Sequence, residues 1–230
     1  MTGLRRWLLG GLMLAGMVTA HADTLPTIGI IGAGQLGGTL APLWSHAGYP
    51  VILSSRHPDQ LKAQVTELGR QARAASPQQA AEKATVVVLA VPYGALPSLA
   101  KSLGNELKGK VVLDVTNPYP GRDGSVAEQA ISQGVGLYSS GLFPEARLVR
   151  GFNSIAAATL SSEAHRSGDK LAVPLAGDDP QALKQVSALV TAAGFDPLVV
   201  GGLDKARLFQ PGSSLFLSSL SRQQLRQQIS

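Results

Sequence analysis

A glycine-rich stretch follows the first apolar run after the N-terminal region of this sequence. Gly32, Gly34 and Gly37 have the spacing G-x-G-x-x-G, directly after residues 27–31 and at the start of a helical pattern. In such a loop the first glycine permits a tight turn, the second lets the backbone approach a pyrophosphate, and the third lets helix and strand pack closely. The N-terminus of the helix then offers free N–H groups and a partial positive charge to an anion. We therefore expect residues 32–37 to bind the diphosphate of a dinucleotide.

The residues about 20 positions further along select the dinucleotide. An NAD or FAD site usually carries a carboxylate there, which accepts hydrogen bonds from ribose hydroxyls. This sequence has Ser54, Ser55 and Arg56 instead, and no carboxylate occurs before Asp59. Hydroxyls followed by a guanidinium suit a 2′-phosphate, because arginine presents a planar fork of donors to phosphate oxygens. The pattern favours NADP over NAD. The alternative is that Arg56 is a solvated loop charge and that the two serines only form a turn.

The elements that would position these residues are short runs rich in Val, Ile and Leu, separated by helical patterns. The runs are continuous rather than alternating, as expected for strands that are covered on both faces of a parallel sheet. They are residues 27–31, 51–53, 86–91, 111–115, 148–149, 171–176 and 198–200. A repeated succession of strand and helix requires right-handed crossovers. It predicts an α/β fold with a doubly wound, mostly parallel Rossmann-type sheet.

Helix ends are marked by residue type. The first helical pattern covers residues 36–47 and stops at Gly48, and Pro42 inside it predicts either a kink or a late start. Two capping boxes are predicted, one at Ser76 and Gln79 and the other at Ser125 and Glu128. Leucine, phenylalanine and isoleucine recur among serines and glutamines in residues 213–230. We expect a C-terminal helix there, which docks either on the body of the protein or on a second copy of the chain in a homodimer.

Residues 1–22 have the anatomy of a secretory signal, with cleavage expected after Ala22. Arg5 and Arg6 precede the apolar run 7–18, which is shorter than the roughly 20 residues that a helix needs to cross a bilayer. We therefore expect no stable membrane span, although an uncleaved membrane helix is the alternative. The arginine pair followed by Trp and two leucines resembles a twin-arginine signal, whose route carries folded proteins with their cofactor. This predicts a periplasmic protein that binds its dinucleotide before export.

The remaining chain divides into a dinucleotide-binding domain, residues 23–212, and the C-terminal helix. The sequence has no cysteine, which excludes disulfides and thiolate catalysis. Its few histidines are far apart, so no metal site is predicted. The formal net charge of +5 is not concentrated in a basic run, so nucleic acid is not an expected partner.

Five blocks of the sequence resemble the NADPH-dependent coenzyme F420 reductase family, and also the related dinucleotide domain of the six-transmembrane metalloreductases. The blocks are residues 28–58, 86–96, 111–120, 147–160 and 174–211. The resemblance implies a Rossmann-type NADP-dependent oxidoreductase, which moves hydride between NADPH and a flavin-like acceptor such as F420. It also implies the roles of the site residues. The diphosphate would lie against Gly32, Ala33, Gly34, Gln35 and Leu36, and the 2′-phosphate against Ser55 and Arg56. The nicotinamide would lie near Ala90, Val91, Pro92 and Asn117.

The residues themselves are compatible with these roles and leave some alternatives open. Asn117 can donate or accept toward a carboxamide, but Asn-Pro is also an ordinary turn signal. Phe152 could stack on an acceptor or belong to the core. No tyrosine is followed by lysine four residues later, so the usual proton donor for carbonyl reduction is missing. A redox cofactor as acceptor requires mainly correct ring placement.

These features predict an exported NADP-dependent oxidoreductase with a small-molecule redox acceptor, either flavin-like (F420-type) or a metal chelate. The alternative is a non-catalytic periplasmic nucleotide-binding or accessory module that retains the fold.

Overall fold

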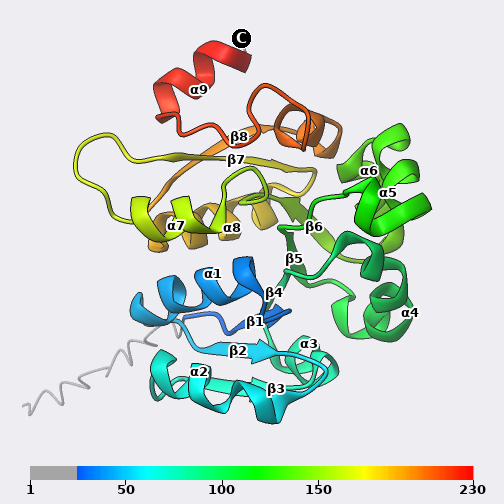
Figure 1. Ribbon diagram of the computed structural model, residues 1–230, viewed down its shortest axis with the longest axis vertical. Helices are drawn as coiled ribbons and strands as arrows, with labels where there is room; N and C mark the ends of the chain where they lie inside the picture. The colour runs from blue at the N-terminus through cyan, green and yellow to red at the C-terminus, as the bar shows by residue number, and fades with distance from the viewer. Residues whose placement is uncertain (1–24, 230) are drawn as a thin grey trace, which may run out of the picture.

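A computed structural model describes residues 25–229, which form one eight-stranded sheet covered by helices (Figure 1). The strand order is β3-β2-β1-β4-β5-β6-β7-β8, so the chain runs outward from β1 to β3 and then returns to β4 on the other side of β1. Ligands bind beside this reversal in doubly wound sheets, at the carboxyl ends of the strands. The strands are β1 (Ile28–Ile31), β2 (Val51–Ser54), β3 (Ala72–Ala75), β4 (Val86–Leu89), β5 (Val111–Asp114), β6 (Arg147–Arg150), β7 (Ala172–Gly177) and β8 (Asp196–Gly201).

Neighbouring strands are parallel except β6 and β7, which pair antiparallel. This confirms the mostly parallel Rossmann-type sheet. Arg150, the last residue of β6, pairs with Ala176 near the end of β7. Because β7 runs in the opposite direction, its first residues extend past the carboxyl end of β6. The β7–β8 pair therefore rises beyond the edge at which the other strands end.

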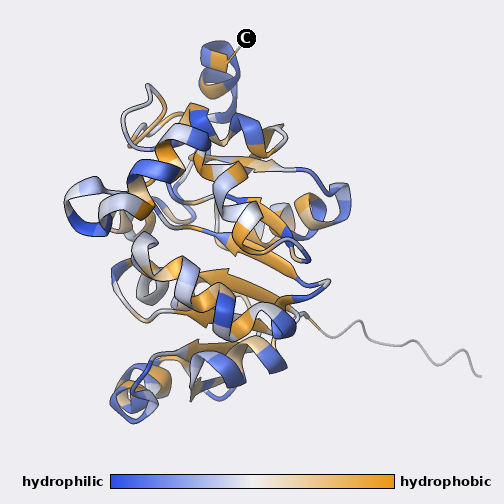
Figure 2. Cartoon of the chain, turned by 90° about the vertical axis from the view of Figure 1, so that its right-hand side faces the viewer, coloured by the Kyte–Doolittle hydropathy of each residue, from blue (hydrophilic) through white to orange (hydrophobic). Residues whose placement is uncertain are grey.

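Helices cover both faces of the sheet. They are α1 (Gln35–His46), α2 (Lys62–Leu68), α3 (Pro77–Lys83), α4 (Leu96–Leu107), α5 (Pro120–Gln133), α6 (Val135–Leu142), α7 (Ala157–Glu163), α8 (Pro180–Ala192) and α9 (Arg222–Ile229). Short 3₁₀ segments, Pro58–Leu61, Tyr93–Ala95 and Leu203–Phe209, connect some of them. Apolar strands lie between helices with polar outer surfaces (Figure 2).

Each central strand supplies side chains to two hydrophobic clusters, one on each face. In β1, Ile28 and Ile30 belong to the cluster that contains Trp44 of α1, whereas Ile31 belongs to the cluster that contains Leu103 of α4. Successive residues of a strand point to opposite faces, so a strand that is buried on both sides is apolar throughout. This explains the continuous apolar runs in the sequence.

The structure differs from the sequence-based expectation in several elements. The strand β3 was not expected, because its residues ARAA form no apolar run. It is a strand because it pairs with the outer edge of β2. The expected late start of the first helix is wrong, since α1 begins at Gln35 and includes Pro42. The capping box at Ser76 and Gln79 is confirmed. Ser125 and Glu128, although both lie within the described range, form no such bonds, and α5 is broken just before them at Gly124, where φ is +54°.

The C-terminal segment docks on the β7–β8 end of the sheet. Its helix, α9, begins at Arg222 rather than at residue 213, and the residues before it form turns and one bridge between Ser221 and Leu171. Leu215 and Leu225 pack in a third cluster with residues of β7 and β8. The docking on the same chain is thus visible, and the homodimer stays a prediction.

The expected export signal, residues 1–22, lies outside the described residues. Within residues 25–229, the helices are too short or too polar to cross a lipid bilayer.

Candidate dinucleotide site at the carboxyl edge of the sheet

The glycine loop connects β1 to α1, as the spacing predicted. Gly32 has a φ of +112°, and a Cβ atom there would collide with the carbonyl oxygen of Ala90. A Cβ atom at Gly37 would collide with the carbonyl oxygen of Gly32, so the start of α1 packs directly on the loop. Both glycines are therefore required by the protein itself.

Gly34 is different, because nothing in the protein requires a glycine there. It caps α1 with φ −73° and ψ −164°, a conformation open to any residue, and a Cβ atom would meet nothing within 4 Å. A side chain at this position would instead fill the space in front of the helix N-terminus. This observation fits a ligand whose diphosphate approaches the backbone closely.

A cavity of about 460 Å³ opens at Gly34 and extends along the carboxyl ends of β4, β5 and β6. The segments that follow β1, β4 and β5 contribute the lining residues Gly34, Gln35, Leu36, Ala90, Val91, Pro92, Val115, Thr116, Asn117, Tyr119 and Arg122. Seven of these were named from the sequence as dinucleotide contacts. Residues that follow β6 and the tip of the C-terminal segment, Phe216 and Leu217, complete the walls. Gly32, Ala33 and Gly37 form the loop behind the cavity. The structure thus brings the expected diphosphate and nicotinamide residues together in one hollow.

The residues expected to bind the 2′-phosphate lie outside this cavity, at the end of the neighbouring strand. Ser54 of β2 pairs with Ile31 of β1, and its carbonyl oxygen accepts a hydrogen bond from the Gly32 amide at 3.2 Å. Ser54 is fully buried, and its hydroxyl donates to the carbonyl oxygen of Ile30 at 2.9 Å. The side chain of Ser54 is therefore used inside the sheet. Ser55 and Arg56 are the groups that the structure leaves at the surface for a phosphate.

Arg56 is exposed beside the glycine loop. Among residues 25–229, no side chain or carbonyl group forms a hydrogen bond or ion pair with it. The hydroxyl of Ser55 accepts a hydrogen bond from the amide of His57 at 3.0 Å, which forms a tight turn at the end of β2. The guanidinium is thus free to bind an anion.

A buried ion pair supports the cavity floor between β5 and β6, and sequence reasoning missed it. Asp114 and Arg150 are both fully buried, and Nη1 of Arg150 lies 2.6 Å from Oδ2 of Asp114. The other carboxylate oxygen accepts hydrogen bonds from the amide and hydroxyl of Thr116, while Nη2 of Arg150 donates to the Thr116 carbonyl oxygen at 2.8 Å. The ion pair therefore fixes the turn that leads into Asn117.

Asn117 is held by a second amide side chain. Its Nδ2 donates to the carbonyl oxygen of Asn153 at 2.7 Å, and its Oδ1 accepts from Nδ2 of Asn153 at 3.1 Å. Nδ2 of Asn153 also donates to the carbonyl oxygen of Phe209 at 3.0 Å. An amide offers two N–H groups and two lone pairs. One N–H and one lone pair of Asn117 therefore stay available at the cavity.

A third polar contact joins the loops that follow β4 and β5. The carboxylate of Asp123 accepts hydrogen bonds from the amides of Gly94 and Tyr119, each at 3.0 Å, and two from Arg122. Burial acts to raise the pKa of Asp123, but these hydrogen bonds and the charge of Arg122 outweigh it, so the pKa lies below its ordinary value. Asp123 thus stays ionised and holds both cavity loops.

Two aromatic residues near the cavity belong to the core. Phe152 is fully buried, and its ring packs edge-on against Trp44 and Phe195, with centroid distances of 6.0 and 5.8 Å. It therefore does not stack on an acceptor. Tyr93 is also fully buried, with its hydroxyl 2.9 Å from Oγ of Ser139. Burial, with the charge of Asp114, raises the pKa of Tyr93 well above its ordinary range, so this hydroxyl is no proton donor at neutral pH.

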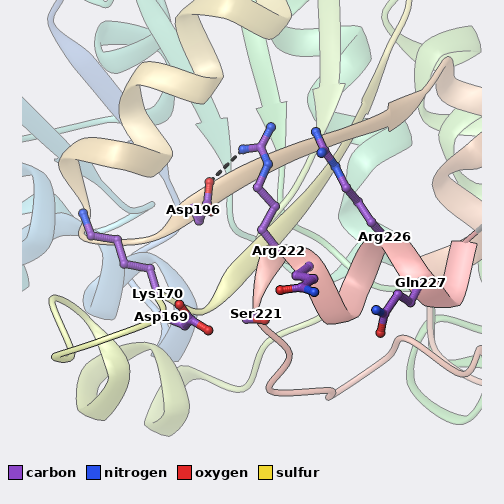
Figure 3. Close-up of a pocket in the computed structure, with 8 residues that line it drawn as sticks. Asp169, Lys170, Asp196, Ser221, Arg222, Arg226 and Gln227 are labelled. Carbon is purple, nitrogen blue, oxygen red and sulfur yellow. Dashed lines mark hydrogen bonds and ion pairs between the residues drawn. The ribbon is translucent and has the colours of Figure 1, made fainter.

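A second cavity, of about 420 Å³, lies between α9 and the starts of β7 and β8 (Figure 3). Nη1 of Arg222 donates to Oδ1 of Asp196 at 2.8 Å and to the carbonyl oxygen of Pro197 at 2.6 Å, and these bonds fasten α9 to β8. None of the residues named from the sequence lines this cavity. Within residues 25–229, no cluster of side chains suited to hold a metal ion occurs.

Residues 27–118 match the sequence model of a family described as NADP oxidoreductase, coenzyme F420-dependent. The F420-dependent NADP reductase of Methanothermobacter marburgensis is 29% identical over 209 residues, which are 85% of this chain and 92% of that protein. The chain is therefore similar to this family over residues 27–118, and to that reductase over most of the length of both proteins. A hypothetical protein from Sinorhizobium meliloti has a similar crystal structure, with a TM-score of 0.74 and 28% identity. That similarity covers 86% of this chain and 96% of the other.

Metalloreductase STEAP3 of Rattus norvegicus is also similar, with 31% identity over 182 residues, or 79% of this chain. The chain spans only about a third of that metalloreductase's length (35%). This similarity therefore concerns one part of a longer protein.

Proposed function

We propose that this protein is an NADP-dependent oxidoreductase that transfers hydride between NADPH and a flavin-like (F420-type) acceptor, or passes the two electrons of NADPH to a metal chelate, one to each of two ferric ions, with release of a proton. The observation that carries the proposal is Gly34, where the protein leaves space for a ligand at the mouth of the cavity and at the start of α1. Similarity to a family of NADP oxidoreductases over residues 27–118 supports the choice of dinucleotide.

Each part of the dinucleotide has a complementary group on this chain. The free amides at the start of α1 would bind the diphosphate. The exposed Arg56 and the half-buried Ser55 would bind the 2′-phosphate beside them. The remaining N–H and lone pair of Asn117 match a primary carboxamide, which needs one acceptor and one donor. Bound NADPH would supply the hydride from its nicotinamide ring.

The polar groups of the cavity indicate what kind of acceptor fits. Within the described part of the chain, no Asp, Glu, His or Lys lines the cavity. Reduction of a carbonyl group requires a proton donor beside the hydride donor. A flavin-like ring takes up the hydride directly and receives its proton from water. The protein therefore has to position the ring but does not have to supply a proton-donating side chain.

The test uses the processed protein, which begins at residue 23. Calorimetry with NADPH measures binding, and the loss of NADPH absorbance is then followed with FMN, F420 and a ferric chelate. We expect binding and oxidation with at least one acceptor. Tight binding without oxidation by any acceptor would favour a non-catalytic module. Absence of binding to either nicotinamide dinucleotide would reject the proposal.

A matched pair of glycine variants tests the placement of the diphosphate. Gly34→Ala should leave the free energy of unfolding unchanged, because its Cβ meets no protein atom. It should weaken NADPH binding at least about tenfold, or about 1.4 kcal/mol. Gly104→Ala in α4, where a Cβ atom also meets nothing, is the control and should alter neither affinity nor fold.

We also propose that the protein is exported to the periplasm by the twin-arginine route after binding its cofactor. The pair Arg5 and Arg6 before a moderately apolar run supports this route. Replacing both arginines by lysine should retain the protein in the cytoplasmic fraction with an unprocessed N-terminus. Unchanged export would show that a different route is used.

A further inference from the structure

We propose that Arg122 binds an anionic group of the acceptor, so that the second substrate is a planar ring compound that carries a phosphate or a carboxylate. This inference rests on the proposed function, because it concerns the acceptor of the same cavity. It is drawn from the charge, the hydrogen bonds and the neighbours of Arg122.

Arg122 is the charged residue of the cavity. Every other described residue that lines it is neutral at pH 7. Two places are expected to bind phosphates of the dinucleotide, namely the start of α1, which follows β1, and Arg56, which follows β2. Arg122 instead follows β5 in the first turn of α5, and its Nη2 donates to the carbonyl oxygen of Asn117 at 2.9 Å. It therefore lies on the nicotinamide side of the cavity, where the acceptor must approach.

The guanidinium of Arg122 is held in place before any ligand arrives. Its Nε and Nη2 donate to the two carboxylate oxygens of Asp123, at 3.0 and 2.8 Å. Its central carbon also lies 5.0 Å from the centre of the Tyr119 ring. An arginine fixed in this way loses little conformational entropy when it binds an anion.

Two N–H groups of Arg122 are left for a ligand. Among the contacts of the described residues, none involves Nη1 of this side chain, which is 47% exposed. The carboxylate of Asp123 is only 2% exposed and is shared with the amides of Gly94 and Tyr119. An anion in the cavity can thus reach the exposed side chain of Arg122, whereas the carboxylate of Asp123 is buried.

Exposed apolar side chains stand beside this cation. Tyr119 is 41% exposed and Leu217 is 58% exposed, and both line the cavity together with Phe216. Large apolar side chains that stay exposed at a cavity mark a binding surface for an apolar group. Leu217 even keeps a φ of +61° at this position, which is unfavourable for leucine. We therefore expect one amphipathic ligand, whose ring lies on the apolar surface and whose anionic group binds Arg122.

Two flavins that share a ring and differ in charge provide the test. FMN carries a phosphate, whereas riboflavin does not. With NADP⁺ present to prevent turnover, quenching of flavin fluorescence measures the affinity for each. We expect the wild-type protein to bind FMN at least about tenfold more tightly than riboflavin, as for one charged hydrogen-bonded contact. During turnover with NADPH, the same preference should appear in KM rather than in kcat.

Arg122→Gln should abolish the preference for FMN while leaving riboflavin and NADPH affinities unchanged. Arg122→Lys should retain part of the preference for FMN, because lysine keeps the positive charge but lacks the planar set of N–H donors of the guanidinium. Arg70→Gln is the matched control, since Arg70 is exposed just before β3, at the amino end of the outermost strand of the sheet. It lowers the net charge equally and should leave the preference intact. Thermal denaturation checks that all variants are folded.

Several results would overturn the inference. Equal affinity of the wild-type protein for the two flavins would do so, as would a failure to bind either. So would an Arg122→Gln protein that keeps the FMN preference, or one that loses NADPH affinity instead, since Arg122 would then contact the dinucleotide. Failure of the proposed function itself gives a distinct result, the absence of NADPH binding in the wild-type protein.

Discussion

The two sides of the cavity are built by different means. On the β1 side the wall is backbone, namely a glycine loop and the start of α1, and the side chains there make few hydrogen bonds. On the β5–β6 side the wall rests on buried polar side chains that bond to one another across elements. A backbone wall is specified by a few glycines close together in the sequence. A wall of buried polar groups requires every partner, because a single unpaired charge in the interior is costly.

The largest effect is expected on the β5–β6 side. Arg150→Met leaves the buried carboxylate of Asp114 without its partner, and should lower the free energy of unfolding by about 3–5 kcal/mol. The double variant Asp114→Leu/Arg150→Met should recover much of this loss, because it removes the charge as well. Urea denaturation of the three proteins measures the coupling. A single variant as stable as the wild type would show that the ion pair does not support this wall.

On the β1 side, Arg56→Ala should act on binding and not on folding. Loss of a charged hydrogen bond to the 2′-phosphate should weaken NADPH binding by about 1.5–3 kcal/mol and leave NADH binding nearly unchanged. Calorimetry with both dinucleotides measures the difference, and Arg70→Ala serves as the control for net charge. Equal losses for NADPH and NADH would remove the basis for choosing NADP.

Gly37→Ala should affect both folding and binding. The added methyl group would collide with the backbone of Gly32, so α1 must shift away from the loop. Overpacking of this kind costs about 1–3 kcal/mol in stability. Because the loop moves, NADPH affinity should fall with it. A Gly37→Ala protein with wild-type stability and affinity would show that this close contact is not required.

The smallest effect is expected for Asp123→Asn, and it depends on pH. The pKa of Asp123 is lowered in the folded protein, so its ionised form stabilises the fold above the ordinary pKa of about 3.9. This contribution is lost as the pH falls through the folded-state pKa. The difference in unfolding free energy between wild type and Asp123→Asn, about 1 kcal/mol at neutral pH, should therefore shrink below about pH 4. If this difference in unfolding free energy did not change with pH, it would arise from packing rather than from the charge of Asp123.

The sequence was most informative where the signal is local. The glycine spacing lies within a few residues and indicated three of the cavity's lining residues, and the resemblance at the ends of two apolar strands indicated four more. It was less informative at Ser54, because a residue at the end of a strand can face the interior or the ligand according to the register with its neighbour. It gave no sign of Arg122 or Asp123, since two charged residues in a turn usually indicate only a solvated surface.

By itself, the sequence determined a doubly wound sheet with a glycine loop after the first strand, because glycine spacing and strand hydrophobicity act through residues close together in the chain. Only the tertiary structure decided that Asp114 meets Arg150, that Asn117 meets Asn153, and that the C-terminal tip closes the cavity. Those contacts join residues far apart in the chain, and they form because strands that end at one edge bring their following loops together. The glycine loop and its place after the first strand could thus be predicted from a short motif. The β5–β6 side of the cavity depends on how distant loops pack.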